Sequence, residues 1–127
     1  MSDAAVGWTI SGEADNGNEA IRLTESLTPD VVLLDVNMPG MNGLDVVKAL
    51  RGSGNSAKIL LLTLQDSQEL IRSAFKLGIN GYLLKTDAEE ELVRALRVVL
   101  GEGVYLSPKL DPHFAKSVVE NISSNSC

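Results

Sequence analysis

The sequence predicts a doubly wound α/β domain, with helices on both faces of a parallel sheet of about four strands. Short, mostly apolar runs at residues 31–34, 58–63 and 79–84 alternate with helical patterns along the chain. Such runs are typical of strands that are covered on both faces in a parallel sheet. Right-handed crossovers then bring the carboxyl ends of the strands to one edge, where we expect the functional side chains.

The first predicted strand and the first predicted helix lie before Pro29. Residues 8–14 alternate between apolar and polar, as in an edge strand with one covered face. The helix is predicted to begin after Asn16 as N-cap, with Glu19 in the capping-box position. Pro29 closes this segment because proline does not continue a helix.

The next three predicted helices end at glycine residues. The second helix stops at Gly52, and the third ends at Gly78 in the position of a left-handed C-cap. The fourth is predicted to begin with Asp87 as N-cap and to continue to Gly101.

The C-terminal part of the chain predicts one more short amphipathic helix, over residues 112–122, and a frayed tail at residues 123–127. We therefore assign residues 1–108 to the domain and residues 109–127 to a short helix and a tail.

Composition excludes several classes of function. The net charge of −6 argues against binding of a phosphate backbone, because such binding needs clustered Lys and Arg. The longest apolar run, residues 59–62, is too short to cross a bilayer, and residues 1–5 lack the pattern of a signal peptide. The single cysteine, Cys127, can form no disulfide within the chain. We expect a cytoplasmic protein that contacts neither membranes nor, by itself, nucleic acid.

Three polar side chains end the three apolar strands: Asp35, Thr63 and Lys85. Singly, each has an ordinary explanation as a turn residue, a β-former or a solvated lysine. Together, a carboxylate, a hydroxyl and an ammonium at one sheet edge suit an acyl-phosphate site. They would supply the nucleophile, a hydrogen-bond donor to a phosphoryl oxygen and a countercharge.

The segment from Pro29 to Gly43, PDVVLLDVNMPGMNG, closely resembles the phosphorylation segment of response-regulator receiver domains. Residues 60–63 (LLLT) and 81–87 (GYLLKTD) resemble the later motifs of that family, and residues 12–20 its second strand and helix.

The sequences of these segments, and of residues 103–108 (GVYLSP), are most similar to the NarL/FixJ branch of transcriptional regulators. The resemblance covers residues 8–108 and implies a flavodoxin-like (CheY-like) fold. Members of that branch usually carry a C-terminal helix-turn-helix domain, for which this chain leaves no room. Contact with DNA is therefore expected only through an output domain that the chain lacks.

The resemblance also implies roles for individual residues. Asp35 would be the phosphoacceptor for a sensor histidine kinase, and Lys85 would be the partner of the phosphate. Thr63 would be the switch hydroxyl and Tyr82 the switch aromatic, although an aromatic residue in a strand is more often part of the core. Asn37 would lend its backbone carbonyl to Mg²⁺.

The sequence departs from the family pattern at its beginning. Receiver domains normally begin with an apolar strand that ends in an acidic pair, which holds Mg²⁺, and a helix follows. Residues 1–7 are too short to supply both elements. Because Mg²⁺ gains affinity from carboxylates, a site made of Asp35 and the carbonyl of Asn37 is expected to be weak. Glu13 and Asp15 could substitute, although a turn acid and a solvated acid explain them as well.

In the family's strand order 2-1-3-4-5, the missing strand would leave the edge of residues 31–34 open. Either residues 8–14 pair directly with that edge, or a second chain pairs there, or a longer natural protein supplies the strand. Pairing between chains would also cover the apolar surface left by the absent helix, so we expect a homodimer.

Three functions follow from these observations. The first is a phosphoryl-accepting receiver that switches an output domain or its own self-association. The second is a degenerate, phosphate-independent receiver that acts as an interaction module. An enzyme on a related sheet is the third, and the absence of a G-x-G-x-x-G segment, a Walker loop and a Ser-His-Asp set argues against it.

Overall fold

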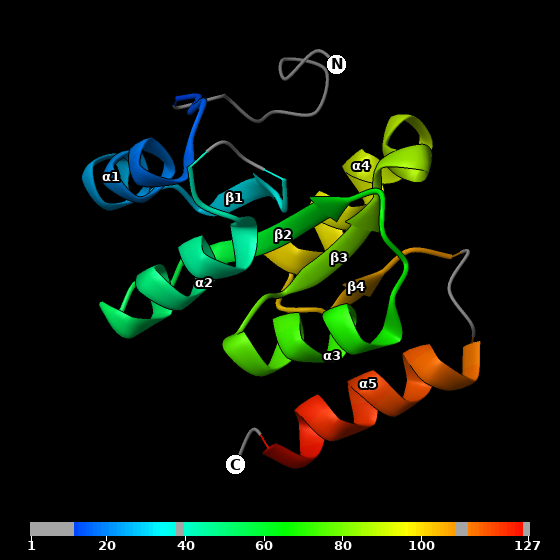
Figure 1. Ribbon diagram of the computed structural model, residues 1–127. Coiled ribbons are helices and arrows are strands. Elements are labelled where there is room, and N and C mark those ends of the chain that lie inside the picture. The colour runs from blue at the N-terminus through cyan, green and yellow to red at the C-terminus, as the bar shows by residue number, and fades with distance from the viewer. Residues whose placement is uncertain (1–11, 38–39, 109–111, 126–127) are drawn as a thin grey trace.

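The computed structural model describes residues 12–37, 40–108 and 112–125 (Figure 1). The elements in chain order are α1 (Gly17–Leu27), β1 (Val31–Asp35), α2 (Gly43–Gly52), β2 (Lys58–Thr63), α3 (Gln68–Leu77), β3 (Gly81–Leu84), the 3-10 turn η2 (Lys85–Asp87), α4 (Ala88–Leu100), β4 (Tyr105–Leu106) and α5 (Pro112–Asn125).

The four strands form one parallel sheet in the order β1-β2-β3-β4. The register places Asp35 opposite Leu62 and Thr63 opposite Leu84, so the carboxyl ends of β1, β2 and β3 lie at the same edge. The predicted α/β class and the three predicted apolar strands are confirmed.

The set of four strands differs from the expected one. Residues 8–11 of the predicted edge strand lie outside the described residues, and residues 12–14 form no strand. Gly12 instead lies against α1, where a Cβ would come within 2.8 Å of the Leu27 side chain. The fourth strand is β4, whose two residues are too few to show a pattern in the sequence.

Several predicted helix boundaries are confirmed by their caps. The Asn16 side chain accepts a hydrogen bond of 2.9 Å from the backbone N–H of Glu19 and so caps α1. Helix α3 ends at Gly78, whose φ of 108° is in the left-handed region that glycine adopts without strain.

Asp87 occupies the N-cap position of α4, as predicted, but its side chain makes no capping hydrogen bond to the helix. Its backbone, with φ −103° and ψ −6°, belongs to the η2 turn rather than to the extended conformation that a capping residue needs. Helix α5 also differs from the prediction, since it continues to Asn125 instead of ending at residue 122.

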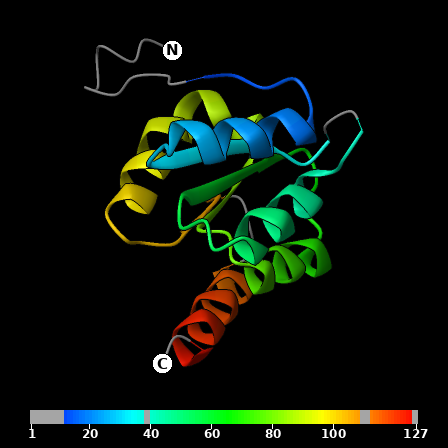
Figure 2. The same ribbon diagram turned by 90° about the vertical axis from the view of Figure 1, so that its left-hand side faces the viewer.

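Helices cover both faces of the sheet, as a doubly wound domain requires. Figure 1 shows α2 and α3 in front of the sheet and α4 behind it, and Figure 2 shows the sheet between them. Strand residues Leu34, Ile59 and Leu61 are buried in the core that α1, α2 and α3 cover. Leu60 and Leu83 point to the opposite core, where Ala95 and Val99 of α4 pack against them.

Helix α5 packs against α3 through its buried residues Phe114 and Val118. The guanidinium of Arg72 on α3 lies 4.8 Å from the centre of the Phe114 ring, which adds a cation–π contact. Among the described helices, none is long and apolar enough to cross a membrane.

Candidate functional site

The three predicted site residues lie at the carboxyl edge of the sheet. Asp35 is the last residue of β1, Thr63 is the last residue of β2, and Lys85 directly follows β3. Asp35 follows the buried Leu34, and Thr63 and Lys85 follow apolar strands that are mostly buried, so the strand ends determine where the polar side chains emerge.

The Asp35 carboxylate has a defined set of partners. Its Oδ2 atom forms an ion pair of 2.6 Å with the Nζ atom of Lys85. Its Oδ1 atom accepts a hydrogen bond of 2.8 Å from the backbone N–H of Asn37. The side chains of Asp35 and Lys85 are 32% and 31% exposed, so a phosphoryl donor in solvent can reach both. The structure therefore brings the predicted nucleophile and its countercharge together.

Thr63 is fully buried between these two residues in the strand order. Its hydroxyl oxygen accepts a hydrogen bond of 3.0 Å from the backbone N–H of Gln65. This contact fixes the start of the loop that follows β2, so the hydroxyl is tied to the loop conformation.

Tyr82 is fully buried in β3, and its hydroxyl donates a hydrogen bond of 2.8 Å to the backbone carbonyl of Gln65. Burial raises the pKa of Tyr82 to about 12, with a smaller contribution in the same direction from the charge of Asp66 and an opposing one from the hydroxyl of Thr63. The phenol therefore stays neutral, and Tyr82 and Thr63 hold the two sides of the same residue, Gln65. Sequence reasoning did not single out Gln65, because this residue makes both contacts through its backbone.

The loop after Asp35 approaches the site closely. The N–H of Gly43 donates a hydrogen bond of 2.8 Å to the carbonyl of Val36. A Cβ at Gly43 would lie 2.8 Å from both the carbonyl oxygen of Asp35 and the Cα of Val36, a separation that real Cβ atoms do not show. Only glycine allows this close approach. Asn42 caps α2 by accepting 2.8 Å and 3.2 Å hydrogen bonds from the N–H groups of Leu44 and Asp45.

The described residues do not make a good site for Mg²⁺. They contain no group of three or more His, Cys, Asp or Glu side chains that could hold a metal ion. Both oxygens of Asp35 already have protein partners, and Glu13 and Asp15 are exposed. Mg²⁺ prefers several oxygen ligands in octahedral geometry, which Asp35 and the carbonyl of Asn37 alone do not provide.

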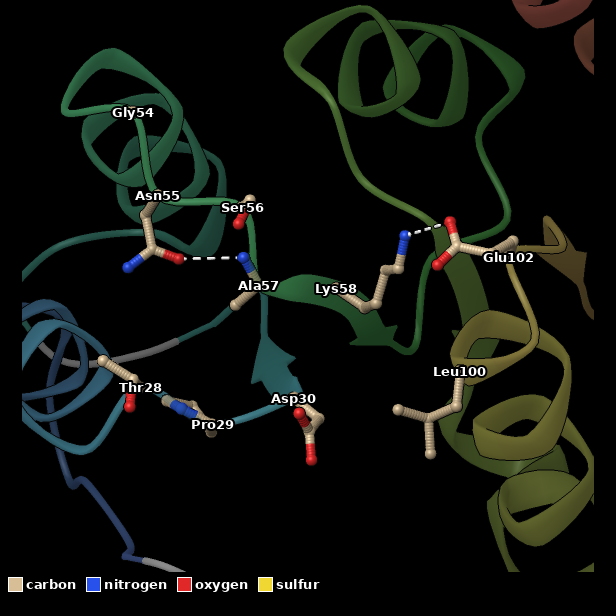
Figure 3. Close-up of a pocket in the computed structure, with 10 residues that line it drawn as sticks. All are labelled: Thr28, Pro29, Asp30, Gly54, Asn55, Ser56, Ala57, Lys58, Leu100 and Glu102. Carbon is tan, nitrogen blue, oxygen red and sulfur yellow. Dashed lines mark hydrogen bonds and ion pairs between the residues drawn. The ribbon is translucent and has the colours of Figure 1, made fainter.

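A hollow of about 780 Å³ lies at the opposite, amino-terminal edge of the sheet (Figure 3). Asp30, just before β1, lies on one side of it, and Leu100 and Glu102 lie on the other. Glu102 is held by an ion pair of 2.7 Å with Lys58 at the start of β2. The hollow is thus separated from Asp35 by the length of the strands and takes no part in the chemistry of that residue.

Comparison with known proteins identifies the family. Residues 5–97 match the model of the response regulator receiver domain. The chain belongs to the response regulator receiver domain family. Receiver domains of this kind are signalling modules of two-component systems rather than typical enzymes.

This receiver domain is similar to known transcriptional regulators. It is 42% identical to the nitrate/nitrite response regulator NarL of Escherichia coli (strain K12), over 89% of this chain and 52% of the relative. Other similar regulators also extend beyond the matched region, and this receiver domain spans about half the length of the curated relatives it matches.

Solved structures support the same assignment. A LuxR-family two-component response regulator from Aurantimonas sp. SI85-9A1 matches with a TM-score of 0.76 and 30% identity, over 91% of this chain and 79% of the other. The receiver domain of a NarL response regulator from Mycobacterium tuberculosis matches with a TM-score of 0.73 and 34% identity, over 78% of this chain and 81% of the other. The predicted resemblance to NarL-type receivers is confirmed.

Proposed function

We propose that this receiver domain accepts a phosphoryl group on Asp35 from a sensor histidine kinase. The observation that carries the proposal is the contact of 2.6 Å between Lys85 Nζ and Asp35 Oδ2, at a partly exposed sheet edge. An ammonium in this position attracts a phosphoryl donor and offsets the charge that its oxygens bring to the carboxylate.

In the proposed transfer, a carboxylate oxygen of Asp35 attacks the phosphorus atom of a phosphorylated histidine. A P–O bond to Asp35 forms while the P–N bond breaks, and the electron pair of that bond returns to the imidazole. Lys85 moves from the carboxylate to a phosphoryl oxygen, and the N–H of Asn37 continues to hold the other carboxylate oxygen.

Thr63 and Tyr82 would convert this local change into a signal. In the structure both residues bind the backbone of Gln65, one through its N–H and the other through its carbonyl. Rotation of the Thr63 side chain toward a phosphoryl oxygen would break its hydrogen bond with the N–H of Gln65. The loop that carries Gln65 then moves, and the hydrogen bond of Tyr82 changes with it. This loop leads into α3, so the output surface would include α3.

Mg²⁺ would bind weakly to Asp35 and the carbonyl of Asn37 in this chain, and we assign it no step of the transfer. Phosphorylation would act on self-association as a homodimer or on an output domain outside this chain, and DNA would be contacted only through such a domain. In this scheme residues 1–108 are the cytoplasmic receiver, and residues 109–127 lead toward the output.

The direct test is incubation of the chain with acetyl phosphate, followed by mass spectrometry of the intact protein and its peptides. One phosphoryl group should appear on the wild type and be absent from Asp35→Asn. Asp30→Asn is a matched control, because Asp30 precedes the same strand at the opposite edge. A modification that persists in Asp35→Asn would exclude Asp35 as the acceptor.

A second candidate function is a phosphate-independent receiver that acts as an interaction module. The lack of a multi-carboxylate metal group among the described residues favours it. Sedimentation of the chain with and without acetyl phosphate distinguishes the two functions. Self-association that is the same in both samples, and in Asp35→Asn, would favour the interaction module.

A further inference from the structure

The carboxyl end of β3 carries Tyr82 and is followed by Lys85. Ser107, the residue directly after β4, makes two hydrogen bonds to the backbone of this strand end. The backbone N–H of Ser107 donates a hydrogen bond of 3.1 Å to the carbonyl of Tyr82. The hydroxyl oxygen of Ser107 accepts a hydrogen bond of 2.8 Å from the backbone N–H of Leu84. Ser107 therefore hydrogen-bonds to the backbone of both Tyr82 and Leu84, and Leu84 is the residue directly before the site lysine.

The hydroxyl of Ser107 takes a place that a backbone carbonyl normally has. Strand β4 is only two residues long, and its register pairs Tyr82 with Leu106. In a longer parallel strand the next carbonyl would receive the N–H of Leu84. Here the chain enters a turn at Pro108, and the serine side chain extends the ladder by one step.

The contact is strong enough to matter because water cannot replace it. Ser107 is 2% exposed and Leu84 is buried, so an N–H without its acceptor would carry the full cost of its lost hydration. Leu84 has an extended backbone, with φ −74° and ψ 136°, and Lys85 begins η2 directly after it. A shift of the Leu84 peptide therefore changes where the Lys85 side chain starts.

From this geometry we propose that Ser107 is a positioning residue, which holds Lys85 in place for Asp35 by fixing the N–H of Leu84. The inference rests on the proposed phosphorylation of Asp35. It also makes Ser107, which directly follows β4, part of the support of the site.

The test is a double-mutant cycle on the rate of Asp35 phosphorylation by acetyl phosphate. Ser107→Ala should slow the phosphorylation of Asp35 several-fold. The loss should persist at saturating acetyl phosphate, because the displaced Lys85 ammonium acts on the donor after it has bound. In a Lys85→Ala background the same substitution should have little further effect, since Ser107 acts through Lys85. Ser107→Thr, which keeps the hydroxyl, should restore most of the rate.

Ser53→Ala is the matched control, because the Ser53 hydroxyl binds the carbonyl of Leu50 at the end of α2, at the opposite edge from Asp35. All rates are measured well below the unfolding transition of each variant. An equal loss of rate from Ser107→Ala with and without Lys85 would mean a general structural role and would overturn the proposal, as would no loss at all.

A crystal structure of Ser107→Ala separates this inference from the proposed function. If the wild type accepts no phosphoryl group, the proposed function fails, but the position of Lys85 is still measurable. Displacement of Nζ from Asp35 Oδ2 supports the positioning role. An ion pair that keeps its length of 2.6 Å would overturn it.

Discussion

The ion pair between Lys85 and Asp35 spans a whole strand. Asp35 ends β1 and Lys85 follows β3, while β2 lies between these strands in the sheet. The lysine side chain reaches across the end of β2, where Thr63 is buried. The ion pair links the ends of β1 and β3 across β2. A change in the charge of Asp35 therefore alters the interactions of the groups that follow β2 and β3.

Replacement of Lys85 by alanine should slow the phosphorylation of Asp35 by about 10- to 100-fold. A hydrogen bond to a charged group contributes about 1.5–3 kcal/mol, and each 1.4 kcal/mol corresponds to about tenfold in rate. The free energy of unfolding should change by less than about 1 kcal/mol, because the pair is partly exposed.

The control for this prediction is Lys58→Ala, which removes an ion pair of similar length, 2.7 Å, at the opposite edge of the sheet. Its rate should equal that of the wild type in a stopped-time assay with acetyl phosphate. Equal losses in the two variants would show that Lys85 has no special role.

Gly43→Ala should both destabilise the protein and slow its phosphorylation. The new Cβ would lie 2.8 Å from the Asp35 carbonyl oxygen, which is backbone and cannot move aside cheaply. Forcing such a contact costs about 1–3 kcal/mol. Urea denaturation measures the loss, and Gly52→Ala is the control because a Cβ there meets nothing within 4 Å. A Gly43→Ala protein as stable as Gly52→Ala would contradict the close approach.

The sequence predicted much of this site because strand ends follow from burial. Asp35, Thr63 and Lys85 could be found since each directly follows a run of apolar residues, and a parallel sheet brings such ends together. Asn16 and Gly78 were predictable for a similar reason, since capping depends on local residue type.

The supporting residues could not be predicted in this way. Gln65 binds Thr63 and Tyr82 through its backbone, so its side-chain type carries no signal. Ser107 acts because a strand of two residues happens to end beside Leu84. Asp87 had the sequence pattern of a cap, but the η2 turn gave its backbone another conformation.

Mg²⁺ should bind this chain weakly, because the described residues contain no group of three or more His, Cys, Asp or Glu side chains that could hold a metal ion beside Asp35. A titration with MgCl₂, followed by the NMR signal of the Asn37 amide, should remain unsaturated at about 1 mM Mg²⁺. Asp35→Asn should abolish even this weak response. Saturation at much lower concentration would show that other carboxylates complete the site.

Tyr82 should make the folded state less stable at high pH. Its pKa is raised to about 12, above the value of about 10 in the unfolded chain. Between these values the unfolded chain loses its phenolic proton first, so stability that is present below pH about 10 is lost as pH rises. The loss approaches about 2–3 kcal/mol near pH 12.

The pH effect can be assigned by comparing two variants. Burial and a hydrogen bond to Glu91 also raise the pKa of Tyr105, so the test uses a Tyr105→Phe background. Urea unfolding at several pH values from about 9 to 11.5 should show a steeper loss with Tyr82 present than with Tyr82→Phe. Parallel curves would mean that the phenol of Tyr82 is not buried in solution.

The last prediction concerns β1, which pairs with β2 and, in the part of the chain that the structure describes, with no other strand. The carbonyl of Asp30 and the N–H of Val36 bind β2, so alternation along the strand turns the peptide groups of Val31 and Leu33 to the other side. The Leu33 side chain is also 45% exposed beside the core of α4.

Such an edge favours pairing, because each peptide group that is buried without a partner costs about 1–3 kcal/mol. We expect the 127-residue chain to associate through this edge, and Leu33→Lys to shift it toward the monomer, since a charge on an edge strand opposes pairing. Sedimentation over a range of concentrations measures the shift. Leu64→Lys is the control, because Leu64 is 65% exposed but lies after β2, away from the edge.

A chain that stays monomeric at every concentration would exclude the dimer. In that case, a shift in the fluorescence emission of the single tryptophan, Trp8, on Leu33→Lys would indicate that residues near Trp8 cover the edge within the same chain.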